Sequence, residues 1–423
     1  MLNAHSRSLI DASTWKGPFI RPRYDAYCFA NLPSAIERAL TGKGETALPA
    51  QALAGLPAQP DAVILLFLDA FGWRFFERYR ERSAFLKHFM GPSGVASTMT
   101  SMFPSTTSAH VTAIHTGLAP GASGVYEWFM NEDSLDATIV PLPFCFAGDR
   151  ARDTLLERGF TADRLFPPDN LYRRLQKAGV DSYVFHPSDY SRGATGKWLY
   201  SLPHVVDYKV LPEALVKLER CLSRQRQRSY YFLYYPELDT LLHQYGPDTD
   251  EVDALAEQLF FTLERFFERL AGRHPNTWLL VTADHGQTAV DPKTCLYLNE
   301  RVPGMARWMR TRANGEPIWP SGSARDTFWH LKPERVDEAA QALAGVLEGR
   351  AEVIRTSALM EQGFFGPVVG DVFRARVGEL TILPYARETV WWKVPGVYEQ
   401  RLLGHHGGLT RDEMEIPLLA CAL

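Results

Sequence analysis

The feature that most constrains the fold is a run of seven apolar residues, AVILLFL, from Ala62 to Leu68. It includes β-branched residues, has no polar position and runs directly into Asp69-Ala-Phe-Gly72. A strand with one solvated face alternates apolar and polar residues, whereas a short continuous apolar run is typical of a strand buried on both faces. The run therefore predicts a central strand in a sheet that is covered on both sides.

Further strands and helices are predicted to alternate along the chain. Short apolar runs at 181–185, 229–235 and 277–282 are bounded by Pro, Gly or Asp and predict buried strands. The segments 108–115 and 252–270 predict helices, the second because its apolar residues recur at helical spacing. This order predicts an α/β fold with a mostly parallel central sheet flanked by helices on both faces.

The segment 295–392 differs from the rest in its Gly- and Pro-rich breaks, its strand candidates and a helix-like stretch at 333–349. It is predicted to form an inserted α+β subdomain. The remaining residues, 1–294 and 393–423, then form one catalytic core. At 423 residues with 46% hydrophobic content the chain can bury a large core, which excludes a disordered or fibrous protein.

The charge balance argues against several kinds of partner. With 45 basic and 49 acidic residues the chain has no excess of positive charge for a polyanion, so binding to nucleic-acid polymers is not expected.

The first 25 residues lack the apolar core of a secretory signal, and no apolar run is long enough to span a bilayer. A cytoplasmic protein without membrane association is therefore expected.

The cysteines give no sign of a disulfide framework or a thiolate metal site. They are odd in number, widely scattered and without CxxC spacing, which favours buried free thiols. The five are Cys28, Cys145, Cys221, Cys295 and Cys421.

Candidate metal ligands lie at or just beyond the predicted strand ends, where open α/β sheets bind their ligands. Asp69 follows the first strand, and Asp284-His285 follows the strand at 277–282. Asp239 and His243 are four residues apart and so share one helical face. Each motif alone has an ordinary explanation, such as a helix cap or a chance pair.

A histidine pair near the end of the chain, in Gly404-His-His-Gly-Gly408, completes the set. Surface-loop histidines would explain this pair on its own. The joint occurrence of three aspartates and three histidines instead provides the mixed oxygen and imidazole donors that suit zinc better than manganese. Six ligands shared between two divalent ions leave open positions for a nucleophile, water and substrate, as a catalytic site requires. The set is Asp69, Asp239, His243, Asp284, His285 and one histidine of the pair His405-His406.

A nucleophile candidate lies in the hydroxyl cluster Ser105-Thr-Thr-Ser108, which follows Phe103-Pro104 at the start of a predicted helix. Helix capping explains such a cluster in ordinary terms. A helix N-terminus also stabilises anions, so a hydroxyl there can face a phosphate and can lose its proton if a metal ion is coordinated to it.

Together these motifs resemble the alkaline phosphatase superfamily, most closely its type I phosphodiesterase / nucleotide pyrophosphatase family. The resemblance covers roughly 61–288 and 404–419. That family has an Asp after the first strand, a Ser or Thr nucleophile nine residues before a Thr-Gly pair, D-x-x-x-H, D-H and a final H-G. The matching residues here are, in order, Asp69, Thr107 before Thr116-Gly117, Asp239 with His243, Asp284-His285 and His406-Gly407.

The resemblance implies a phosphoester hydrolase with two metal ions. One ion would be held by Asp239, His243 and His406, and the other by Asp69, Asp284, His285 and the oxygen of Thr107. The hydroxyl of Thr107 would attack phosphorus and form a phosphothreonine, which water then hydrolyses with overall retention at phosphorus. The substrate would be a small phosphoester such as a nucleotide.

Several alternatives remain open at this stage. Thr106 is a rival for the nucleophile, and His405 is second to His406 as a ligand. Family members carry a phosphate-binding Asn 21 residues after the nucleophile, where this chain has Trp128. Arg325, in the inserted segment, either supplies a basic group to the pocket or is a solvated loop residue. Substrate recognition is assigned to the inserted subdomain and to aromatic residues, with burial in the core as the alternative: Phe71, Trp73, Tyr126 and Trp128.

The absence of an identifiable arginine clamp favours diesters or pyrophosphates over phosphomonoesters. No cysteine lies in a C-x-P-x-R sequence, which excludes a sulfatase. A metal-stabilised binding module without turnover is the alternative from a different class. The sequence does not specify an oligomeric state.

Overall fold

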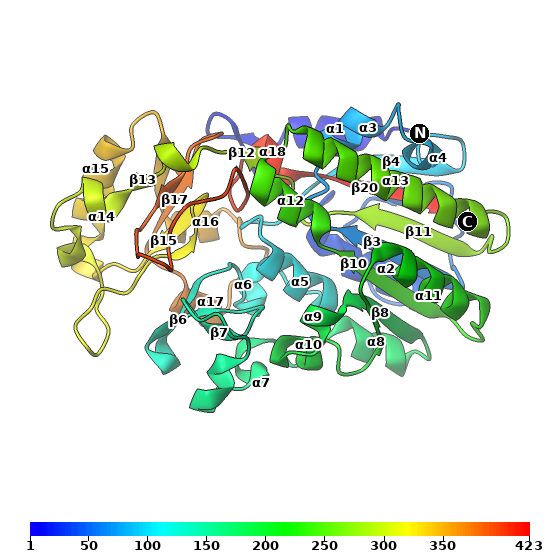
Figure 1. The fold of residues 1–423 in the computed structure, drawn as a ribbon, viewed down its shortest axis with the longest axis horizontal. Helices are drawn as coiled ribbons and strands as arrows, with labels where there is room; N and C mark the ends of the chain where they lie inside the picture. The colour runs from blue at the N-terminus through cyan, green and yellow to red at the C-terminus, as the bar shows by residue number, and fades with distance from the viewer.

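The computed structural model describes residues 1–423. Its centre is a seven-stranded sheet with the order β4-β20-β11-β3-β10-β8-β9 (Figure 1). Strands β11, β3, β10, β8 and β9 run parallel, whereas β20 is antiparallel to both of its neighbours. The bounds are β3 Ala62–Leu68, β4 Gly94–Thr100, β8 Asp181–Pro187, β9 His204–Tyr208, β10 Ser229–Tyr235, β11 Thr277–Thr282 and β20 Glu415–Ala422.

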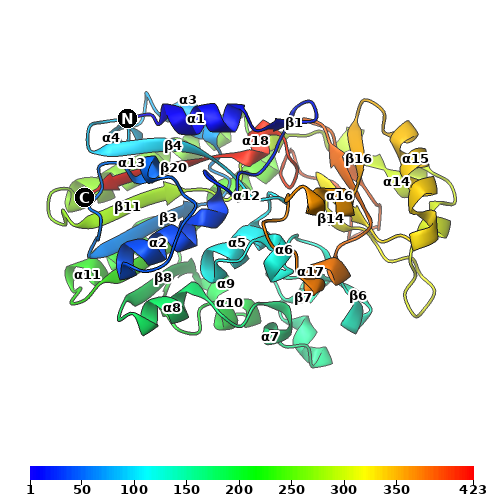
Figure 2. The same ribbon diagram turned by 180° about the vertical axis from the view of Figure 1, so that it is seen from behind.

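Helices cover both faces of this sheet, which confirms the predicted fold class (Figures 1 and 2). Every residue of β3, β10 and β11 is buried, as continuous apolar strands between two helical layers must be. One layer contains α3 Trp73–Tyr79, α4 Ala84–His88, α11 Leu211–Ser223, α12 Glu237–Tyr245 and α13 Asp250–Leu270, and the other α1 Ala4–Asp11, α2 Leu32–Thr41, α5 Thr107–Thr116 and α8 Leu171–Lys177.

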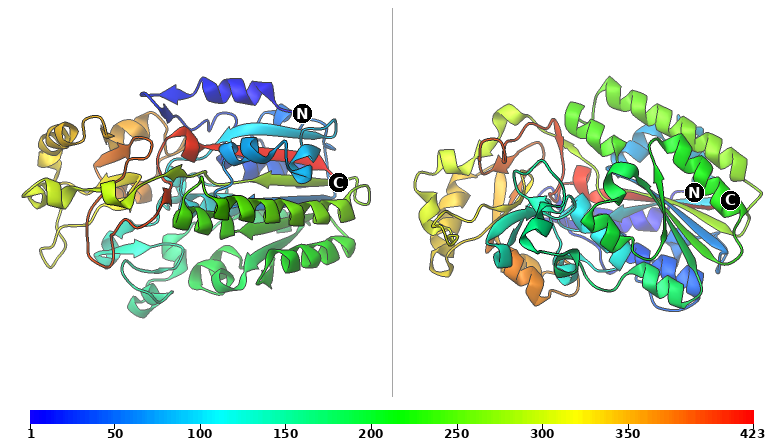
Figure 3. Two further views of the ribbon diagram at one scale, coloured as in Figure 1. Left: turned by 45° about the horizontal axis from the view of Figure 1, so that its top comes forward. Right: turned by 60° about the horizontal axis from the view of Figure 1, so that its bottom comes forward.

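A second, antiparallel sheet lies beyond one end of the central sheet, in the order β14-β15-β17-β16 (Figure 3). With α15 Val336–Val346 it encloses a separate hydrophobic cluster of 19 residues between Leu296 and Tyr398. Phe328, Phe365 and Phe373 from the same region pack into the main core instead. The division of the chain at 295 and 392 stays a prediction. The strands are β14 Ser321–Ser323, β15 Asp326–Trp329, β16 Ala351–Arg355 and β17 Leu380–Pro384.

Short elements connect these units. They are β1 Thr14–Trp15, β2 Phe19–Ile20, α6 Pro120–Ser123, β5 Met130–Glu132, β6 Ala137–Val140, β7 Cys145–Phe146, α7 Ala162–Leu165, α9 Ser188–Ser191, α10 Ala194–Leu199, β12 Thr288–Ala289, β13 Leu296–Tyr297, α14 Leu298–Arg301, α16 Thr356–Glu361, α17 Asp371–Arg376, β18 Val390–Trp391, β19 Gly404–His405 and α18 Arg411–Met414. None of the helices has the length and apolar character needed to cross a bilayer. All five cysteines are free thiols, three of them buried.

Candidate active site

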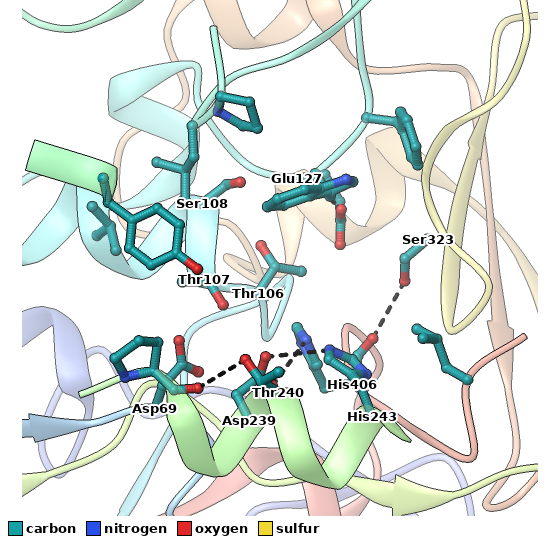
Figure 4. A pocket seen from close by; sticks show the side chains of 18 of the residues that line it. Asp69, Thr106, Thr107, Ser108, Glu127, Asp239, Thr240, His243, Ser323 and His406 are labelled. Atoms are coloured by element: carbon teal, nitrogen blue, oxygen red, sulfur yellow. Dashed lines mark hydrogen bonds and ion pairs between the residues drawn. The ribbon is translucent and has the colours of Figure 1, made fainter. Parts of the chain in front are cut away.

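The predicted site residues meet at the carboxyl ends of parallel strands. Asp69 directly follows β3, the Asp239 and His243 pair lies on α12 after β10, and Asp284-His285 follows β11. The ends of β3 and β10 border a cavity of about 470 Å³, whose lining includes Asp69, Asp239 and His243. Figure 4 shows Asp69, Asp239, His243 and His406 gathered on one side of this cavity, with Thr107 facing them. The position is the one where parallel α/β sheets generally bind ligands.

The ligand candidates form two neighbouring clusters. In the first, the Asp239 carboxylate lies 3.4 Å from His243 Nε2 and 3.7 Å from His406 Nε2. In the second, His285 Nε2 lies 3.6 Å from Asp69 Oδ1 and 3.2 Å from Asp284 Oδ2. The rings of His285 and His406 stack with centroids 3.6 Å apart, so the clusters adjoin. The structure thus brings all six predicted side chains together.

The histidines of both clusters are oriented alike. Each uses Nδ1 to donate to a backbone carbonyl: His243 to Gly404 at 2.8 Å, His285 to Gly286 at 3.1 Å and His406 to Ser105 at 2.9 Å. Donation from Nδ1 fixes the ring and leaves Nε2 as a lone-pair donor toward the carboxylates. This arrangement is the one that metal-binding histidines require.

The two buried carboxylates of the second cluster have no positively charged side chain beside them. Asp69 Oδ1 and Asp284 Oδ2 are buried and have no hydrogen-bond partner. Burial, followed by the neighbouring Asp284, raises the pKa of Asp69, and burial raises the pKa of Asp284 to about 6. Burial also lowers the pKa of His285 to about 3, which keeps the ring neutral. Adjacent carboxylates and a neutral imidazole fit a divalent cation, since an unpaired buried charge is otherwise costly.

Three further residues of the site were missed in the sequence. The Tyr234 hydroxyl donates to Asp69 Oδ2, and Gln287 Nε2 donates to Asp239 Oδ1 at 2.5 Å. Arg152 lies in the lining of the cavity. Tyr234 is next to last in β10, and Gln287 lies two residues after His285. Their positions as polar residues close to strand ends could have indicated that they belong to the site. The sequence around Arg152 contains no motif that would have indicated such a role.

The structure separates the two threonines of the nucleophile segment. The Thr107 hydroxyl lies 3.3 Å from His285 Nε2, at the first residue of α5. The Thr106 hydroxyl is buried and donates to the Tyr126 carbonyl at 3.1 Å. Thr106 is the N-cap residue, yet its side chain makes no capping hydrogen bond. The hydroxyl of Thr107 is therefore the one that faces the ligand clusters, and it lies at the N-terminus of a helix.

Other sequence expectations need correction. Arg325 is neither a pocket residue nor a solvated one: it is fully buried and pairs with Glu413 through two bonds of 2.9 and 2.8 Å. Of the aromatic candidates, only Trp128 lines the cavity, with 42% of its surface exposed. The other three belong to the hydrophobic core, because their rings fill space between helices and sheet: Phe71, Trp73 and Tyr126. His405 lines the cavity and contacts the His406 backbone.

Comparison with known proteins agrees with this geometry. The profile of the family described as type I phosphodiesterase / nucleotide pyrophosphatase matches residues 63–407, most of the chain. The chain belongs to this family of metal-dependent phosphoesterases and is therefore a hydrolase. No curated protein matches it in sequence.

Solved structures show the same fold. Murine ectonucleotide pyrophosphatase / phosphodiesterase 5 superimposes with a TM-score of 0.64 at 19% identity, over 84% of this chain and 87% of that one. An inactive variant of the murine protein in complex with AMP gives 0.63 at 19% identity over the same shares. The human protein gives 0.61 at 16% identity, again over 84% and 87%.

Proposed function

We propose that this protein is a two-metal phosphodiesterase or nucleotide pyrophosphatase that acts through a phosphothreonine on Thr107. The observation that carries the proposal is the Thr107 hydroxyl, 3.3 Å from His285 and at a helix N-terminus, beside two adjoining Asp/His clusters. One ion is assigned to Asp239, His243 and His406. The other is assigned to Asp69, Asp284, His285 and Thr107.

Zinc is the favoured metal because each site combines carboxylate and imidazole donors, with manganese second. When bound, the ions supply the positive charge that lowers the pKa of the threonine hydroxyl and stabilises charge on the phosphoryl oxygens. Tyr234 and Gln287 hold the carboxylates of Asp69 and Asp239 in place. Such hydrogen bonds to ligands orient them and are part of the site.

The reaction then proceeds in two displacements. The Thr107 hydroxyl gives its proton to solvent, and Oγ1 forms a bond to phosphorus while the bond from phosphorus to the leaving oxygen breaks. The leaving oxygen keeps the electron pair and takes up a proton from solvent. The free N–H groups at the start of α5 face the negative charge that develops on the phosphoryl group. Water next attacks phosphorus from the opposite side, the bond to Thr107 breaks, and the threonine regains its proton. Two inversions give net retention.

The substrate is proposed to be a small phosphoester such as a nucleotide. The AMP complex of the murine relative supports a nucleotide. The cavity supports an organic substituent, since aromatic side chains form part of its wall, including Trp128, Tyr190 and Trp391. A phosphomonoester is the alternative substrate.

Metal content provides the first test. Protein supplemented gently with zinc should contain close to two metal ions per chain, because two ligand clusters adjoin at the cavity. Asp284→Asn or His406→Ala should lose at least one ion and nearly all activity. Elemental analysis of the purified variants measures this directly. A stoichiometry near zero in the wild type would rule out the two-metal proposal.

Substrate preference provides the second test. Bis-p-nitrophenyl phosphate should turn over faster than p-nitrophenyl phosphate in the presence of zinc or manganese, since neither the sequence nor the ligand clusters include an arginine clamp for a dianion. The measurement is the ratio of the kcat/KM values for the two compounds. A monoester advantage of more than about tenfold, a barrier difference of about 1.4 kcal/mol, would replace the diesterase by a phosphatase. Turnover of neither compound would favour a binding module.

A further inference from the structure

One positively charged side chain lines the cavity, and the other charged side chains in its lining are carboxylates. Arg152 is the only lysine or arginine that lines it, on the segment after β7. A positive group in such a cavity attracts an anion, and the proposed function already assigns the reacting phosphate to the ligand clusters. The carboxylates in the same lining are Asp69, Glu127, Asp239 and Glu399.

The guanidinium of Arg152 forms no ion pair with a carboxylate. Its one hydrogen bond is from Nη2 to the Leu142 carbonyl at 3.1 Å, and the side chain is otherwise exposed to solvent. The nearby acids serve other groups: Asp149 accepts from the Thr154 hydroxyl at 2.6 Å, and Asp153 accepts from the Ala194 N–H at 2.9 Å. Most of the five N–H donors of Arg152 therefore remain for a ligand.

An aromatic ring contacts this arginine at the wall of the cavity. The guanidinium lies over the ring of Tyr190 on α9, 5.6 Å from its centroid. Tyr190 itself lines the cavity, and His186 packs edge-on against it with centroids 6.0 Å apart. Contact with an aromatic face restricts a guanidinium, so less freedom is lost when its N–H groups bind the oxygens of a phosphate.

We propose that Arg152, held against Tyr190, binds a second phosphate of the substrate while the reacting phosphate lies at Thr107. This inference rests on the proposed function and narrows its substrate class to compounds with two phosphates. The second phosphate has two chemical sources: the next phosphate of a polyphosphate chain, or a phosphate on the sugar.

The test is a binding measurement on the zinc-loaded Thr107→Ala protein, in which turnover does not interfere. Titration calorimetry compares AMP, ADP and adenosine 3′,5′-bisphosphate. The compound whose second phosphate reaches Arg152 should bind about tenfold or more tightly than AMP, the range for a charge-assisted hydrogen bond. A gain for ADP identifies a polyphosphate chain, and a gain for the bisphosphate identifies the sugar phosphate.

Arg152→Gln in the same background should remove this gain and change AMP affinity less than about twofold, since AMP carries no second phosphate. Arg152→Lys should keep part of it. The matched control is Arg150→Gln, an exposed arginine outside the cavity, which should keep the full gain. Equal affinity for all three compounds, or equal losses for AMP and the preferred compound in Arg152→Gln, would overturn the inference. Diester turnover by the unmodified protein tests the proposed function independently.

Discussion

Thr107→Ala should abolish turnover while the protein still folds and binds metal. The variant removes the only hydroxyl placed to attack phosphorus, whereas its structural cost is small. In the folded protein that hydroxyl has one partner, His285 Nε2 at 3.3 Å, and the loss of one such hydrogen bond costs about 1 kcal/mol. Diester hydrolysis, elemental analysis and circular dichroism on one preparation measure all three properties.

Neighbouring variants test the assignment within the segment. Thr107→Ser should keep measurable activity, because it retains a hydroxyl at the same point. Thr106→Ala should keep most of the rate, since the Thr106 hydroxyl is bonded to the Tyr126 carbonyl and faces away from the ligand clusters. An inactive Thr106→Ala beside an active Thr107→Ala would show that the wrong threonine had been chosen.

The phosphothreonine can also be observed directly. Acid quenching during turnover should trap phosphate on the chain, and peptide mass analysis should locate it on Thr107. Phosphate on neither threonine would mean that water displaces the leaving group in a single step.

The sequence predicted that the ligand candidates would lie together, because they lie in short motifs, most of them at or just after the end of a strand. Asp69 and Asp284 each follow a short apolar run that is typical of a buried strand, and parallel strands bring their carboxyl ends to one edge. Asp239 and His243 share a helical face. Local spacing was sufficient for each of these placements, and parallel order brought them together.

Packing between distant segments was not predictable in this way. Strand β20 contains Pro417, which in sequence argues against a central strand, yet it lies between β11 and β4. Strand β4, GVASTMT, alternates too weakly to be recognised. Tyr234 and Gln287 contact their carboxylate partners only because the fold brings other segments beside them: Asp69 after β3 and Asp239 on α12. Arg325 was misjudged for the same reason: its partner, Glu413, is 88 residues away in the chain.

Arg325 leads to the prediction with the largest effect on stability. Arg325 and Glu413 are both completely buried, and Arg325 also donates to the Tyr385 carbonyl at 2.7 Å. Arg325→Met should lower the free energy of unfolding by about 3–5 kcal/mol, because it leaves the Glu413 carboxylate buried without a counter-charge. Urea denaturation of metal-free protein measures the loss without a contribution from bound ions. The exposed pair Arg335 and Glu338 supplies the control, Arg335→Met, whose cost should be at most about 1 kcal/mol.

The same ion pair connects stability to the active site. Glu413 accepts from the N–H of Gly408 at 3.0 Å, two residues after His406, and Ser323 from the Arg325 hairpin donates to the His406 carbonyl at 3.3 Å. Arg325→Met should therefore weaken zinc binding as well as folding, since the loop carrying His406 loses its support. Adding Glu413→Gln to Arg325→Met should recover part of the folding energy, because no buried charge is then unpaired. A double variant less stable than Arg325→Met would show that the loop depends on the Glu413 carboxylate itself, through Gly408 and Thr410, more than on the ion pair.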